Sequence, residues 1–224
     1  MEYEGDYINN KYNGKGYDED GNILYELDNG NGKIKEYDLV GELEFEGEFL
    51  EGKRNGKAKE YKFGSLIYEG EFLNGKRNGK GKEYFDGKLK FEGEYLRGKR
   101  WNGKGYDESN NVTYILKNGN GYIKEYDITL MFEGDYLNGE RNGKGKEYDP
   151  FGIYKFEGEY LNDEKNGRGK EYYNGEIGFE GEYLNGHKIK GKEYIKGRLE
   201  YEGDYLFEKK LNGRGYDENG NIIY

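Results

Sequence analysis

The sequence predicts an all-β protein: an elongated, twisted, single-layer antiparallel sheet of about ten stacked β-hairpin repeats. Three observations support this fold. A repeat of about 22 residues runs through all 224 residues, and each repeat holds two short strand-like runs around an Asn/Gly-rich turn. The 40 glycines disfavour helix, since each costs about 1 kcal/mol relative to Ala inside one. We therefore expect one continuous array over residues 1–224, without a separate domain or linker.

Each repeat opens with an aromatic residue followed by Glu-Gly, and two weaker versions fill the gaps in the series. The strong starts are Tyr3, Phe45, Tyr68, Phe91, Phe132, Phe156, Phe179 and Tyr201, and the weaker ones are Tyr25 and Tyr114. A chain built of such units stabilises itself collectively, because one hairpin cannot bury its own apolar face.

The repeat from Tyr68, YEGEFLNGKRNGKGKEYFDGKLK, shows how each unit is built. YEGEFL and GKGKEY have the length of strands, and NGKRNG joins them as a turn. The second turn, Asp86-Gly87, leads to the next hairpin. It suits a type I′ turn, in which both central residues need a positive φ. The next strand therefore follows at once as an antiparallel neighbour.

Alternation with a period of two divides each opening strand into two faces. Phe91, Gly93 and Tyr95 point one way, and Glu92 and Glu94 point the other. This pattern favours aromatic rings lying over glycine backbone on one face and Glu–Lys cross-strand pairs on the other. The sequence leaves open the exact register and the face that Tyr84 takes.

Two repeats are shorter than the others, and we expect short hairpins at residues 25–44 and 114–131. Tyr25 to Tyr37 spans 12 residues, whereas Tyr68 to Tyr84 spans 16. Strands about two residues shorter leave notches in the margin of the sheet. Such notches are either partner sites or variations that adjust the twist.

The stretch from Tyr68 to Tyr84, YEGEFLNGKRNGKGKEY, resembles MORN repeats, and the resemblance recurs along the whole chain. It implies an elongated, twisted array of hairpins, with membrane association as a role often proposed for the family. One departure is Glu83, together with Glu147 and Glu171, where the family usually has an aromatic residue. The Lys-Glu-Tyr variant is also similar to a bacterial branch of MORN-like repeats that includes proteins labelled as antitoxins.

The composition argues against an enzyme and against bound cofactors or metals. The chain has no Cys and one His, which excludes disulfides, thiolate zinc sites and cysteine nucleophiles. The segments DEDGN at Asp18 and DENGN at Asp217 are explained as turns, because neither has the Glu that a calcium loop needs at its twelfth position. We expect no nucleic acid and no small-molecule substrate. Without a membrane span or a signal peptide, we expect a cytoplasmic protein.

The leading functional prediction is a scaffold or adaptor that binds protein partners, including a second copy of itself, through the aromatic face. Ring ladders of this kind serve either as a core or as a binding groove, and both alternatives stay open. The predicted partner-binding residues are Phe45, Phe49, Tyr68, Phe72, Phe91, Tyr95, Phe132, Tyr136, Phe156, Tyr160, Phe179 and Tyr183.

The second prediction is a peripheral membrane adaptor that binds acidic phospholipids through basic hairpin turns. Stacked hairpins bring successive turns about 10 Å apart along one margin, which suits an anionic surface. The predicted anion-binding residues are Lys53, Arg54, Lys76, Arg77, Lys99 and Arg100. A glycan-binding repeat and an antitoxin-like protein are lesser alternatives.

Overall fold

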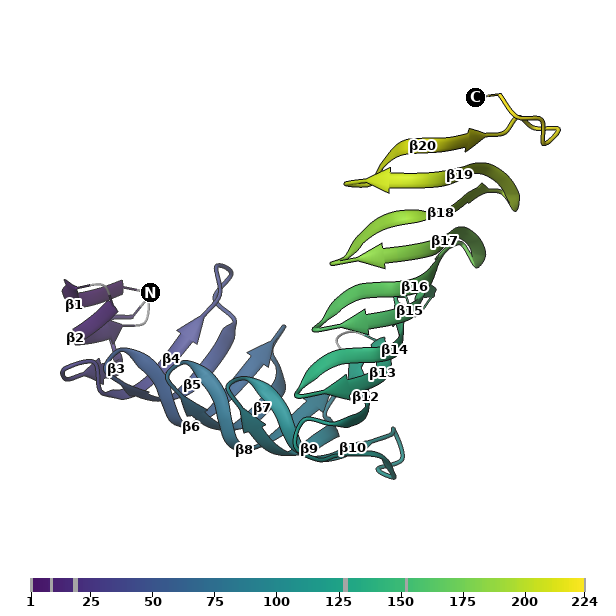
Figure 1. The fold of residues 1–224 in the computed structure, drawn as a ribbon. Helices are drawn as coiled ribbons and strands as arrows, with labels where there is room; N and C mark the ends of the chain where they lie inside the picture. The colour runs from purple at the N-terminus through teal and green to yellow at the C-terminus, as the bar shows by residue number, and fades with distance from the viewer. Residues whose placement is uncertain (1, 9, 18–19, 127–128, 152, 224) are drawn as a thin grey trace. The chain divides into compact units, whose positions relative to one another are not determined.

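In the computed structural model, the described residues are 2–8, 10–17, 20–126, 129–151 and 153–223, and they form β-strands without any helix. Every strand pairs with its sequence neighbour as an antiparallel hairpin, except where one sheet ends and the next begins (Figure 1). The predicted all-β architecture of stacked hairpins is therefore confirmed. The chain divides into two compact units, Met1–Lys117 and Asn118–Tyr224.

The first unit holds two sheets, one of three strands (β1–β3) and one of eight (β4–β11). Its strands are β1 (Glu2–Ile8), β2 (Asn10–Tyr17), β3 (Ile23–Leu27), β4 (Gly32–Tyr37), β5 (Leu43–Leu50), β6 (Lys53–Lys62), β7 (Ser65–Leu73), β8 (Lys76–Phe85), β9 (Lys88–Leu96), β10 (Lys99–Tyr106) and β11 (Val112–Leu116).

The second unit is one sheet of nine strands in sequence order. Its strands are β12 (Gly121–Tyr126), β13 (Leu130–Leu137), β14 (Glu140–Tyr148), β15 (Tyr154–Leu161), β16 (Glu164–Tyr173), β17 (Glu176–Leu184), β18 (His187–Ile195), β19 (Arg198–Leu206) and β20 (Lys209–Gly215).

Two-residue turns with positive φ at both central positions join many of these strands. Asp86 and Gly87 have φ values of 48° and 69°, and Asn174 and Gly175 have 52° and 82°. Positive φ at both central residues is the signature of a type I′ turn, which matches the right-handed twist of the flanking strands. The predicted turn chemistry is therefore confirmed at these positions.

A row of glycines crosses the eight-stranded sheet of the first unit and the nine-stranded sheet of the second. In the first unit Gly70 pairs with Gly81, which pairs in turn with Gly93. A Cβ added at Gly70 would lie 2.7 Å from the Cα of Gly81, so the two backbones leave no room for a side chain. In the second unit a Cβ at Gly145 would lie 2.5 Å from Cζ of Phe132. The rings therefore rest on bare glycine backbone, as the alternation predicts.

Within each unit the aromatic side chains pack in a row, and most neighbouring rings meet edge to face. Phe45 packs on Phe72, and Phe72 packs on Tyr68, with ring centroids 5.6 and 5.5 Å apart. Tyr68 packs on Tyr95 at 5.2 Å. The second unit repeats the arrangement from Phe132 to Tyr205. Edge-to-face packing links each hairpin to its neighbour, and such pairs add about 0.5–1.5 kcal/mol beyond area burial.

The short repeats coincide with breaks between sheets. β3 and β4 have 5 and 6 residues, against 9 and 10 in β7 and β8. A single bridge, Asp28 with Asn31, joins β3 to β4, so their sheets end there. β11 and β12 likewise belong to different sheets. The continuous array stays a prediction, and residues 127–128 of the second short range lie outside the described residues.

Candidate functional site

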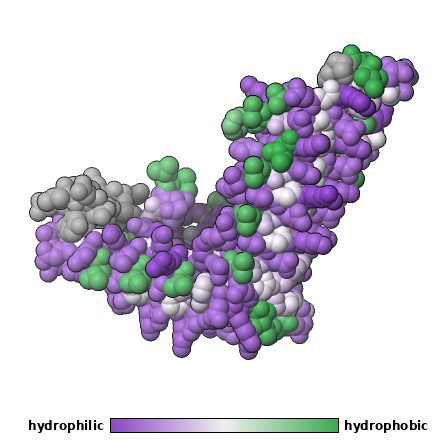
Figure 2. Space-filling view, in the orientation of Figure 1, coloured by the Kyte–Doolittle hydropathy of each residue, from purple (hydrophilic) through white to green (hydrophobic). Residues whose placement is uncertain are grey.

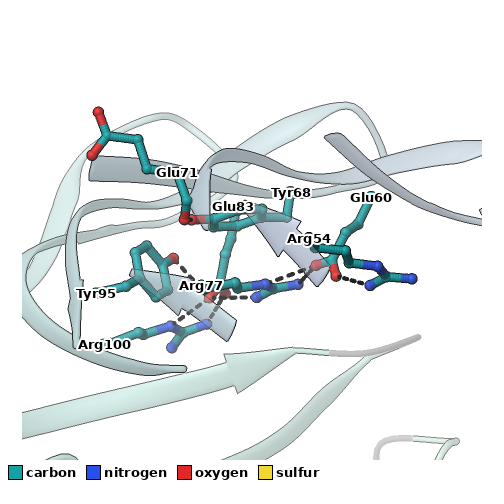
Figure 3. Close-up of polar contacts among 8 residues, drawn as sticks. All are labelled: Arg54, Glu60, Tyr68, Glu71, Arg77, Glu83, Tyr95 and Arg100. Carbon is teal, nitrogen blue, oxygen red and sulfur yellow. Dashed lines mark hydrogen bonds and ion pairs between the residues drawn. The ribbon is translucent and has the colours of Figure 1, made fainter. Parts of the chain in front are cut away.

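The aromatic face carries a second layer of ion pairs, in which carboxylates and cations alternate along the sheet. Arg77 donates from Nε to Glu60 Oε2 at 2.8 Å and from Nη1 to Glu83 Oε1 at 3.3 Å (Figure 3). Arg100 binds the same Glu83 carboxylate through Nε, at 3.1 Å, and through Nη2. Glu60, Glu83, Glu147 and Glu171 each contact cations from two hairpins, so the layer joins these hairpins to one another. We call it the ion-pair ladder, and it consists of Glu36, Arg54, Glu60, Arg77, Glu83 and Arg100 in the first unit and Glu125, Arg141, Glu147, Lys165, Glu171, Lys188, Glu193 and Lys210 in the second.

The cations of the ladder also cover the rings beneath them. The guanidinium carbons of Arg54 and Arg77 lie 4.1 Å from the ring centroids of Phe45 and Tyr68. In the second unit the ammonium nitrogens of Lys165 and Lys188 lie 4.0 and 4.5 Å from the rings of Phe156 and Phe179. A cation at this distance interacts with the ring face and shields it from solvent. Charged side chains therefore cover the aromatic core.

Burial and charge shift the pKa values of the ladder groups Glu83 and Arg100 in opposite directions. Burial by itself would raise the pKa of Glu83, but the attraction of Arg100 and Arg77 outweighs it and holds that pKa below its ordinary value. Burial likewise opposes the charged form of Arg100, yet Glu83 keeps its pKa well above the ordinary value. Burial, with Glu83 next in effect, raises the pKa of Tyr95 well above its ordinary value. These groups therefore stay in their paired ionisation states through the neutral range.

The structure places the predicted partner-binding rings in this core. Phe49 and Tyr136 are partly buried, and the other ten rings are buried at 4% exposure or less. Of the two alternatives that the sequence left open, this burial supports packing. Binding of a partner by these rings stays a prediction.

The predicted anion-binding residues separate into two groups. Arg54, Arg77 and Arg100 belong to the ion-pair ladder and contact carboxylates of the same chain. Lys53 and Lys76 are exposed in their turns, and Lys99 is partly exposed. Anion binding by the six residues stays a prediction, but three of them already have Glu partners.

The face opposite the rings is hollowed into a groove in the first unit. Its volume is about 1020 Å³, and glycines, with Ala58, form its floor. Rows of Glu and Lys from successive strands form its walls. The wall residues are Glu46, Glu48, Glu69, Glu71, Glu92 and Glu94 with Lys33, Lys35, Lys57, Lys59, Lys80, Lys82 and Lys104.

The register across this groove sets opposite charges against one another. Lys82 lies opposite Glu69 on one side and Glu92 on the other. The Lys59 ammonium lies 3.7 Å from Glu46. The expected Glu–Lys pairing is therefore confirmed in the register. With six Glu and seven Lys, the walls carry a net charge of only +1.

Tyrosine hydroxyls on the groove face donate hydrogen bonds to the wall carboxylates. Tyr84 donates to Glu69 Oε1 at 2.6 Å, and Tyr61 donates to Glu46 Oε1 at 2.8 Å. Tyr84 therefore lies on the face of the Glu and Lys residues, which the sequence left undecided. Burial, followed by the hydrogen bond to Glu69, raises the pKa of Tyr84 to about 12.

The second unit repeats this groove at about 710 Å³. Its floor includes Gly169, Gly181 and Gly191. Its walls carry four carboxylates and four cations, so they are electrically balanced. The wall residues are Glu157, Glu180, Glu182 and Glu202 with Arg168, Lys170, Lys190 and Lys192.

The described residues hold no cluster of three His, Cys, Asp or Glu suited to a metal ion. At Asp217, Oδ1 accepts hydrogen bonds from the backbone NH groups of Asn219 and Asn221, at 2.9 and 2.8 Å. This geometry is an Asx turn, so turn chemistry explains the segment. Asp18 lies outside the described residues. The described residues also form no helix that is long and apolar enough to cross a membrane.

Five segments of the chain match the MORN repeat model, at residues 3–17, 45–62, 68–88, 132–150 and 156–176. The chain therefore carries MORN repeats. These repeats are generally modules that bind proteins or membranes and are not typically enzymes. No curated protein sequence matches the chain.

Sequence reasoning missed the ion-pair ladder and the two grooves. A signal for the ladder was present, because Arg54 and Glu60 are six residues apart, as are Arg77 with Glu83 and Arg141 with Glu147. A cation and a carboxylate recurring at a fixed even spacing on one strand indicate a shared face. The cations lie beside turns, where side chains are usually solvated, so the spacing alone does not predict that they turn onto the rings.

Proposed function

We propose that this protein is a non-enzymatic scaffold whose two grooves each bind a segment of a partner protein. The observation that carries the proposal is the repeated groove with a glycine floor and with walls of mixed carboxylates and cations whose net charge is +1 in one unit and 0 in the other. The rings first predicted to bind a partner are buried under charged side chains, which favours the opposite face of the sheet.

The small net charge of the grooves favours a polypeptide segment, and not an acidic surface, as the bound partner. Walls at +1 and 0 do not attract an anionic polymer or bilayer by net charge. They do offer alternating carboxylate acceptors and ammonium donors at strand spacing, about 4.8 Å apart. A segment carrying both acidic and basic residues matches that pattern, and glycines at the floor let its backbone approach closely.

The test uses capture of partners from the source cell, followed by binding of the purified partner measured by calorimetry. The groove variant is Lys80→Glu with Lys82→Glu, and the control is Lys196→Glu with Arg198→Glu at a hairpin turn between β18 and β19. Both change the net charge by −4. We expect the groove variant to weaken binding at least about tenfold and the control to leave it unchanged. Equal binding by wild-type protein and groove variant would contradict the proposal.

A second candidate is binding of acidic phospholipids through the turn lysines of the first unit. The observation that favours it is the exposure of Lys53 and Lys76 in successive turns. Flotation with phosphatidylserine vesicles at low salt tests it, since binding should fall as salt rises. Failure to float at the lowest salt would remove this candidate. The glycan-binding and antitoxin-like alternatives stay predictions.

A further inference from the structure

In each unit, one margin of the stacked hairpins carries a row of exposed leucines, at the turns that follow β5, β7 and β9 in the first unit and β13, β15, β17 and β19 in the second. Each leucine is the last residue of its strand, immediately before the turn. Its exposure lies between 40% and 54% in every case. These residues are Leu50, Leu73 and Leu96 in the first unit and Leu137, Leu161, Leu184 and Leu206 in the second. We call the two rows the first and the second leucine margin. Figure 2 shows hydrophobic patches recurring along the hairpin ends of the second unit.

Hydrogen bonds between successive turns hold the leucine margins in place. In the first unit the Gly75 NH donates to the Arg54 carbonyl at 2.8 Å, and the Gly98 NH donates to the Arg77 carbonyl at 2.7 Å. In the second unit the Gly186 NH donates to the Lys165 carbonyl at 2.9 Å. Neighbouring turns are therefore fixed at the spacing of one hairpin, about 10 Å. Because both units have this construction, the two leucine rows have the same period.

The charges beside the leucines differ in sign between the two margins. In each hairpin we count the turn residues between the leucine and the ladder cation. The first margin has four cations and one anion, which gives 4 − 1 = +3, from Lys53, Lys76, Arg97, Lys99 and Glu51. The second has one cation and four anions, which gives 1 − 4 = −3, from Lys209, Glu140, Asp163, Glu164 and Glu208, with His187 counted as neutral.

We infer that the first leucine margin of one molecule binds the second leucine margin of another copy of this chain. The leucine rows share a period, so apolar side chains can meet in register over several hairpins. The charges flanking them are equal in size and opposite in sign, which favours the first margin against the second and opposes contact between identical margins. Packed leucines supply the contact area, and the charges select the partner margin.

This inference concerns a different surface from the proposed function. The grooves lie on the face of the sheet opposite the rings, whereas the leucine margins lie at the turns. Each chain carries both margins, so copies associate either as a closed pair or as a chain of molecules. In both cases the weight-average sedimentation coefficient rises with concentration. A margin of three or four leucines is a small interface, and we expect weak association.

The test is sedimentation velocity of the full chain from about 1 µM to about 1 mM, in low and high salt. Variant A is Lys53→Glu with Lys76→Glu, and variant B is Glu140→Lys with Glu164→Lys. We expect each variant alone to associate at least about tenfold more weakly than wild-type protein. A mixture of A and B restores association, because every A–B contact between unlike margins joins opposite charges. The control, Lys196→Glu with Arg198→Glu, changes the net charge as much as A and should associate like wild-type protein.

Four results would overturn the inference. One is a wild-type chain that stays monomeric over the whole concentration range at low salt. Another is a mixture of A and B that sediments no faster than either alone. The third is unchanged association in Leu73→Ser with Leu161→Ser, when circular dichroism shows an intact sheet. A variant A that loses only vesicle binding, with association intact, would assign the first margin to lipid instead.

Discussion

Tyr95 donates its hydroxyl to Glu83 Oε1 at 2.8 Å, and so joins the aromatic core to the ion-pair ladder above it. Glu83 lies on β8, within one hairpin, and Tyr95 lies on β9, in the next. The same carboxylate binds Arg77 from its own hairpin and Arg100 from the following one. One side chain therefore connects both layers and two repeats, which makes Glu83 the most informative site for mutation.

We predict that Glu83→Ala lowers the free energy of unfolding by about 3 kcal/mol. The substitution leaves Arg77 and Arg100 mostly buried without the carboxylate between them, and removing one partner of a buried pair is strongly destabilising. Urea unfolding followed by circular dichroism measures the change. Glu176→Ala, at an exposed site, is the control and should change stability by less than about 0.5 kcal/mol. Similar losses in the two variants would show that the ladder does not stabilise the sheet.

We predict that stability falls on acidification through the carboxyl range, and that Glu83→Gln and Glu171→Gln reduce this dependence. Burial opposes ionisation of both groups, but Arg100 and Arg77 at Glu83, and Lys188 and Lys165 at Glu171, hold both pKa values below the ordinary value. A lowered folded-state pKa contributes stability above the unfolded-state pKa, and that stability is lost as the pH falls through the folded-state pKa.

The measurement is urea unfolding of wild-type protein and both variants at pH 7, 5 and 3. Wild-type protein should lose more stability than either variant between pH 5 and pH 3. Parallel pH profiles for all three proteins would rule out a contribution from these two carboxylates.

We predict that Gly81→Ala destabilises the protein by about 1–3 kcal/mol, the usual cost of overpacking a core. The added Cβ would lie 2.6 Å from Cζ of Tyr68 and even closer to its hydroxyl. At the equivalent place in the preceding hairpin the chain already has Ala58, where the neighbouring ring is Phe45. The double variant Gly81→Ala with Tyr68→Phe should therefore recover part of the loss. Thermal unfolding of the single and double variants tests this. If the stability losses of the two single substitutions simply add in the double variant, the clash with the Tyr68 hydroxyl is not the cause.

We predict that Arg77→Lys costs about 1–2 kcal/mol. The guanidinium binds Glu60 and Glu83 through separate nitrogens, whereas one ammonium cannot reproduce that fork. The reverse change, Lys188→Arg, should stabilise the protein. The Lys188 ammonium contacts Glu171 through a single nitrogen, at 2.8 Å, and a guanidinium can bind the same carboxylate through two. Urea midpoints measure both changes, with Arg198→Lys at an exposed turn as the control. Opposite signs for the first two substitutions are the expected result.

The regular parts of the fold were predictable because they depend on local chemistry. The Asp86-Gly87 pair dictates a tight turn, and the alternation of Phe91, Gly93 and Tyr95 places the rings on one face. The same alternation put Glu92 opposite the rings, and the register with Lys82 confirms it. The side-chain direction of Arg77 was not predictable in this way, because a residue next to a turn is usually solvated.

By itself the sequence determined the repeat, the hairpins, their turns and the face of each ring, since these follow from spacing and backbone preference over a few residues. Only the tertiary structure decided that Arg77 and Arg100 turn inward onto Glu83, that the rings are covered, and that the opposite face is hollowed. Those features depend on contacts between hairpins about 20 residues apart, where neighbouring charges compete with water for each side chain. Local pattern cannot resolve that competition, because its outcome depends on how closely the strands pack.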